Sequence, residues 1–152
     1  MKFLKIFGIE ISIVTLVIGL FFAPKIYQLL SQENVIFTEP SGLTLNDSGG
    51  ALMLGDGSFL EVSMTPKNIL PLDKITFIIK NVDAQEVKAT IRGLNMNMGE
   101  HTYVFKKISP HHFTSTLMLP SCSIDMHWQM DLYVTKNSTL YGLGFHFWSI
   151  NY

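Results

Sequence analysis

The sequence is poor in cysteine and in charge. It holds one cysteine in 152 residues, which excludes an intramolecular disulfide framework and any multi-cysteine zinc cage. Charged residues make up 15% of the chain, well below the ~25% of an ordinary soluble protein. The 11 Lys and Arg are balanced by 12 Asp and Glu, with no basic block, so we expect no nucleic-acid partner.

The common catalytic motifs are also missing. The chain has no Gly-x-Ser-x-Gly elbow, no glycine-rich phosphate loop and no His-x-x-x-His metal pair. Cys122 and a distant histidine could form a thiol dyad. Such a dyad needs a lowered thiol pKa and an orienting partner, and the residues around Cys122 give no local sign of either. We therefore expect the protein not to be an enzyme.

Much of the apolar content lies at the N-terminus. An apolar run of 18 residues extends from Ile6 to Ala23, interrupted by Glu10, and as a helix it is ~27 Å long, enough for a bilayer core. Lysines flank it, with two of the three on the N-terminal side, which favours an N-terminus inside the cell. A cleaved signal peptide is the rival interpretation, but the residues from Phe21 to Pro24 make a poor cleavage site. We expect residues 1–30 to be an uncleaved signal-anchor transmembrane helix that holds the rest of the chain outside the cytoplasm.

The remainder is typical of short β-strands. Residues 31–57 are rich in Gly, Asn, Asp and Ser, which predicts a linker and an irregular edge, with room for a short strand at 51–54. From residue 58 onward, apolar residues alternate with polar ones in runs about ten residues apart. The expected strands cover residues 59–64, 74–80, 86–94, 103–105, 113–119, 125–134 and 140–148. The predicted fold is mainly β, an antiparallel sandwich over residues 58–152, with a small closed barrel as the alternative.

Soft metal donors gather in the second half of the chain. There are 8 methionines, and Met96 and Met98 are two residues apart, so in an extended segment they project to the same side. His101 follows them, and Cys122 lies in a predicted turn. Thioether and thiolate ligands select Cu(I) over harder cations. Met96, Met98, Cys122 and His101 are therefore the candidate ligands of a Cu(I) site, with ordinary packing as the alternative for each.

Other methionines and histidines fit structural roles better. Met126, Trp128 and Met130 share one face of a predicted strand, which favours core packing. His127 should then point to the outer face, and the pair at 111–112 should form a hairpin tip.

Three segments together resemble a known group of proteins: Gly93 to Gly99 (GLNMNMG), Leu119 to Cys122 (LPSC) and Met126 to Met130 (MHWQM). With an N-terminal anchor, they resemble the FixH-like and YtkA-like periplasmic proteins. They are also similar to small proteobacterial proteins linked to copper handling and haem-copper oxidase assembly. The resemblance covers about residues 58–135 and implies an immunoglobulin-like β-sandwich without enzymatic activity. It implies a single-pass protein of the bacterial inner membrane, with its C-terminal domain in the periplasm.

Two functional hypotheses follow. In the first, the domain binds or relays Cu(I) for the maturation of a respiratory oxidase. Met96 and Met98 are then ligands, and Cys122 or His101 completes the site. In the second, it is a metal-free interaction module that binds a membrane-protein partner through a sheet edge or the methionine loop. The distance between the methionine sulfurs and Cys122 separates the two, because a metal site needs its donors close together.

Overall fold

A computed structural model describes residues 35–38, 43–47 and 49–151. The chain divides into two compact units, Met1–Glu33 and Asn34–Tyr152, and all the described residues belong to the second. The transmembrane helix expected at residues 1–30 lies outside the described residues. Within the described part of the chain, no helix is long and apolar enough to cross a membrane.

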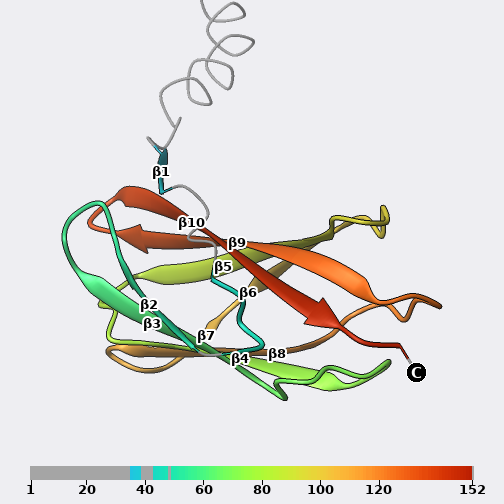
Figure 1. Ribbon diagram of the computed structural model, residues 1–152. Coiled ribbons are helices and arrows are strands. Elements are labelled where there is room, and N and C mark those ends of the chain that lie inside the picture. The colour runs from blue at the N-terminus through green and yellow to red at the C-terminus, as the bar shows by residue number, and fades with distance from the viewer. Residues whose placement is uncertain (1–34, 39–42, 48, 152) are drawn as a thin grey trace, which may run out of the picture. The chain divides into compact units, whose positions relative to one another are not determined.

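In the described residues, ten strands form two five-stranded sheets (Figure 1). The first sheet has the order β1 (Val35–Thr38), β10 (Thr139–Ser149), β9 (Met126–Lys136), β5 (Glu86–Gly93) and β6 (Glu100–Val104). The second has the order β2 (Gly50–Met53), β3 (Phe59–Thr65), β4 (Lys74–Lys80), β8 (His112–Met118) and β7 (Lys106–Ser109). Neighbouring strands are antiparallel, except that β1 runs parallel to β10. The predicted mainly β fold with antiparallel sheets is confirmed.

Alternation of apolar and polar side chains explains why each strand has one buried face. In β4, Ile75, Phe77 and Ile79 are buried, whereas the lysines at both ends are exposed. β9 follows the same rule, and Met126, Trp128 and Met130 are each at most 1% exposed. The prediction that these three residues pack in the core is confirmed.

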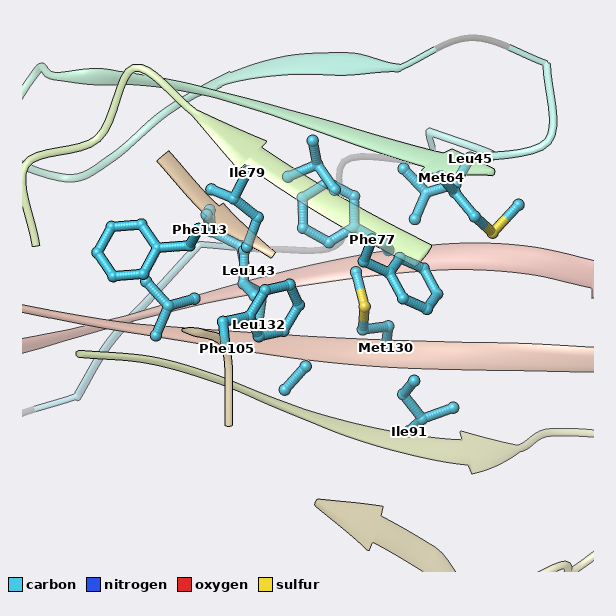
Figure 2. Close-up of a cluster of buried hydrophobic side chains, with 14 of the residues drawn as sticks. Leu45, Met64, Phe77, Ile79, Ile91, Phe105, Phe113, Met130, Leu132 and Leu143 are labelled. Atoms are coloured by element: carbon cyan, nitrogen blue, oxygen red, sulfur yellow. The ribbon is translucent and has the colours of Figure 1, made fainter. Parts of the chain in front are cut away.

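The core lies between the two sheets, which both supply side chains to it (Figure 2). Phe77 of β4 meets Phe147 of β10 edge to face, with ring centroids 5.6 Å apart. Trp128 is fully buried, and its indole N–H donates to Ser149 Oγ at 2.9 Å, so its one polar atom is satisfied. The two sheets therefore share one continuous core.

Residues 31–57, expected as a linker and irregular edge, contribute to both sheets. β1 and β2 are outer strands of the first and second sheet, and Leu45 and Leu54 are buried in the core. The short strand expected at 51–54 corresponds to β2.

Of the strand expected at residues 103–105, the first two residues belong to β6 of the first sheet, and the next strand lies in the second sheet. β6 ends at Val104 and β7 begins at Lys106, while Phe105 between them is buried and donates its N–H to Val87 O at 2.9 Å. The chain therefore crosses from one sheet to the other at this aromatic residue. Alternation alone does not mark such a crossing.

Three loops meet at one end of the second unit. They join β3 to β4, β5 to β6, and β8 to β9, and the C-terminal end of β10 lies beside them (Figure 1, right). This end carries the candidate site.

Candidate metal centre

Two of the predicted ligands come into direct contact. Met96 lies in the β5–β6 loop and Cys122 in the β8–β9 loop, 26 residues further along the chain. The Cys122 thiol donates to Met96 Sδ, with the two sulfur atoms 3.4 Å apart. Met96 is 40% exposed, while Cys122 is half-buried and packs against the core. The pair thus joins an exposed residue to a partly buried one.

Asn95 holds the β5–β6 loop against the start of β9. Its side-chain N–H donates to Asp125 O at 2.8 Å, and its oxygen accepts from the His127 backbone N–H at 3.1 Å. A backbone bond from Leu94 N to His127 O, 2.8 Å long, completes the attachment. These three bonds fix the residue before Met96 to the strand that follows the Cys122 loop, which explains how the two sulfurs meet.

Gly93 allows the same loop to fold back closely over β9. A Cβ atom at this position would collide with the Met96 carbonyl and would lie 2.9 Å from Met126 Cε. The collision with backbone is costly, because a carbonyl cannot rotate away as a side chain can. The position therefore requires glycine.

Met98 and His101 form a second pair. Met98 is partly buried and packs against the core, and its carbonyl oxygen lies 3.1 Å from His101 Nε2. Because a carbonyl oxygen only accepts, His101 Nε2 is the donor in this contact. The four predicted ligands thus form two pairs, Met96 with Cys122 and Met98 with His101.

A small cavity of about 20 Å³ adjoins Cys122, with room for about one water molecule. Cys122 and Met126 both line it, together with residues of the β3–β4 loop and the end of β10. Met126 is thus the second sulfur-containing residue on this cavity, in addition to its place in the core. Sequence reasoning favoured core packing for Met126, although it follows Cys122 by four residues.

The donors at this end are sulfur rather than oxygen. Among residues 35–38, 43–47 and 49–151, no three His, Cys, Asp or Glu side chains gather in one place that could hold a metal ion. The nearby carboxylate of Asp125 is already engaged, since it accepts the Asn151 backbone N–H at 2.7 Å. The arrangement therefore suits a soft cation and offers little to Mg²⁺ or Ca²⁺.

The predictions for the other histidines are confirmed in part. His127 lies on the opposite face of β9 from Trp128, as predicted. His111 lies at the tip between β7 and β8, but His112 is the first residue of β8 and pairs with Ser109.

Comparisons with known proteins give little further guidance. No family model matches the sequence, and no curated protein matches it. The fold resembles part of a DUF4785 family protein from Legionella pneumophila, with 18% identity and a TM-score of 0.44. That match covers 61% of this chain and 29% of the Legionella chain, so this chain spans less than a third of that protein.

Proposed function

We propose that the domain binds Cu(I) through the Met96 thioether and the Cys122 thiolate, and that it carries this ion as cargo. The supporting observation is the 3.4 Å separation of the two sulfur atoms, which belong to different loops. A thioether and a thiolate together prefer Cu(I) to harder ions.

Each residue has a distinct role in this proposal. Cys122 loses its thiol proton when Cu(I) binds, so one proton leaves for each ion taken up. Met96 is the exposed sulfur and presents the ion to a donor or acceptor protein. Asn95 is a positioning residue that holds the loop in place before any ion arrives. His101 Nδ1 and Met98 are the candidates for a third ligand.

The proposal extends to the whole chain. It includes the N-terminal anchor, the periplasmic location, the kinship with FixH-like and YtkA-like proteins and a role in oxidase maturation. These parts rest on the sequence features given above. An immunoglobulin-like topology is part of the same proposal. Strands β3-β4-β8-β7 follow the order of the ABED sheet, and β5-β9-β10 follow the CFG sheet.

A competition titration tests the Cu(I) site. The purified full-length chain is titrated with Cu(I) under reducing conditions against a chromophoric Cu(I) chelator. We expect one ion per chain from the wild type, and a loss of at least about tenfold in affinity for Met96→Leu and for Cys122→Ser.

Met53→Leu is the matched control, because Met53 is another exposed methionine, on β2 of the second sheet. It should bind Cu(I) like the wild type. Unchanged Cu(I) affinity in the Met96→Leu, Cys122→Ser double variant would overturn the proposal.

A second candidate function is partner binding without a metal. Leu70, Leu72 and Ile124 line the same cavity and are exposed, with Leu72 66% exposed. Apolar side chains held in water suit a protein interface. Under this alternative, the wild type does not compete with the chelator for Cu(I), and Leu72→Ser weakens partner capture.

A further inference from the structure

Two histidines and a tryptophan gather on the outer face of the first sheet. His127 of β9 lies opposite Trp148 of β10, and His146 lies diagonally across from His127. The His127 ring stacks on the Trp148 ring, with centroids 4.0 Å apart and an interplanar angle of 5°. The two imidazole centroids are 5.2 Å apart. These contacts involve neither Met96 nor Cys122.

His146 has an unused nitrogen. Its Nδ1 atom is buried and has no hydrogen-bond partner within the part of the chain that the structure describes. Leaving a buried polar atom unpaired is unfavourable. A bond from Nδ1 to a metal ion would replace the missing hydrogen bond.

The His127 ring is partly buried and lies against the rings of Trp148 and His146. Stacking on Trp148 also limits the rotation of the His127 ring, which reduces the entropy lost on binding.

We infer that His127 and His146 form a second metal site, separate from the sulfur pair. This site binds a divalent ion that prefers imidazole ligands, and it binds Cu(II) most tightly. Imidazole suits Zn²⁺, Ni²⁺ and Cu²⁺, and Cu²⁺ binds most tightly in this series. With metal–nitrogen bonds of ~2.1 Å, two imidazole centroids around one tetrahedral ion would lie about 5 Å apart. The observed 5.2 Å agrees with that spacing.

Neighbouring polar residues are already engaged. The Asp131 carboxylate lies 3.7 Å from Arg92 and accepts from Gln129 Nε2 at 2.7 Å. The protein therefore supplies two nitrogen ligands, and water or an incoming donor takes the other positions.

The structure contains its own reporter for this site. Trp148 is 44% exposed and stacked on His127, so a paramagnetic Cu(II) ion bound there should quench its fluorescence. The experiment uses the full-length Cys122→Ser chain titrated with Cu(II), because this background removes thiol oxidation. We expect quenching at one equivalent and an electron paramagnetic resonance spectrum with two imidazole nitrogens. Trp148→Phe should remove the quenched emission and keep that spectrum.

Histidine variants decide the assignment. In the same background, His127→Asn and His146→Asn should each weaken Cu(II) binding by at least about tenfold. His111→Asn and His112→Asn serve as matched controls and should leave the affinity unchanged. Circular dichroism checks that each variant is folded, and His127→Asn alone is decisive if His146→Asn fails to fold. Wild-type affinity in folded His127→Asn, or loss of binding only in the His111 and His112 variants, would overturn the inference.

Discussion

Asp56 shows how one side chain connects the two sheets. In the turn between β2 and β3, its Oδ1 accepts from the Ser58 backbone N–H at 2.9 Å and from Ser58 Oγ at 2.6 Å. Its Oδ2 accepts from Lys136 Nζ at 2.6 Å, at the end of β9 in the other sheet. These bonds favour the carboxylate and lower the pKa of Asp56 to about 2, with the Lys136 bond the largest cause.

The free energy of unfolding should therefore depend on pH at this residue. Because the Asp56 pKa falls from 3.8 to about 2 on folding, its contribution is complete above 3.8 and is lost as the pH falls towards 2. Asp56→Asn should lower the free energy of unfolding by about 1 kcal/mol or less at neutral pH, as for other exposed pairs. Urea denaturation at several pH values measures the difference between variant and wild type. A difference that stays constant down to pH ~2.5 would contradict this prediction.

At the scale of elements, the β9–β10 hairpin has a two-residue turn. Lys136 pairs with Thr139, and the residues between them, Asn137 and Ser138, have φ values of 50° and 61°. Left-handed conformation at both central positions is the mark of a type I′ turn. Asn tolerates it, whereas Ser is strained there.

Glycine at the second position should relieve this strain. Ser138→Gly removes a penalty of ~1–2 kcal/mol for the left-handed conformation of the folded state. Part of this gain is lost because glycine gives the unfolded chain more conformational entropy. We expect the free energy of unfolding to rise by about 0.5–1 kcal/mol, measured by urea denaturation. Ser138→Ala keeps the penalty and should give no gain. An equal gain from alanine would show that the turn conformation is not the cause.

The strands also show what sequence reasoning can and cannot reach. Residues 74–80 alternate clearly and coincide with β4. The four residues of β1 are too few to alternate recognisably, and their partner on β10 lies about a hundred residues away. Residue chemistry predicted Met96 and Cys122 as ligands. Their contact depends on the β5–β9 pairing and on Asn95, which no local sequence pattern predicts.

At the scale of the whole domain, the contact between Phe77 and Phe147 couples the two sheets. Edge-to-face aromatic pairs contribute ~0.5–1.5 kcal/mol beyond the area that they bury. A double-mutant cycle of Phe77→Leu and Phe147→Leu should therefore give a coupling energy in that range. Phe59 is 59% exposed, so Phe77→Leu and Phe59→Leu should be additive. A coupling near zero for the first pair would mean that the sheets are held by buried area alone.

The parallel pairing of β1 with β10 has a mechanical consequence. The chain enters β1 at Val35, beside Leu140, and leaves β10 at Ser149, at the opposite end of that strand. A force that pulls these two ends apart acts along both strands in opposite directions. The hydrogen bonds of the pair then bear the load together in shear, instead of opening one by one like a zipper. Resistance to such a pull depends on the rate of forced unfolding rather than on equilibrium stability.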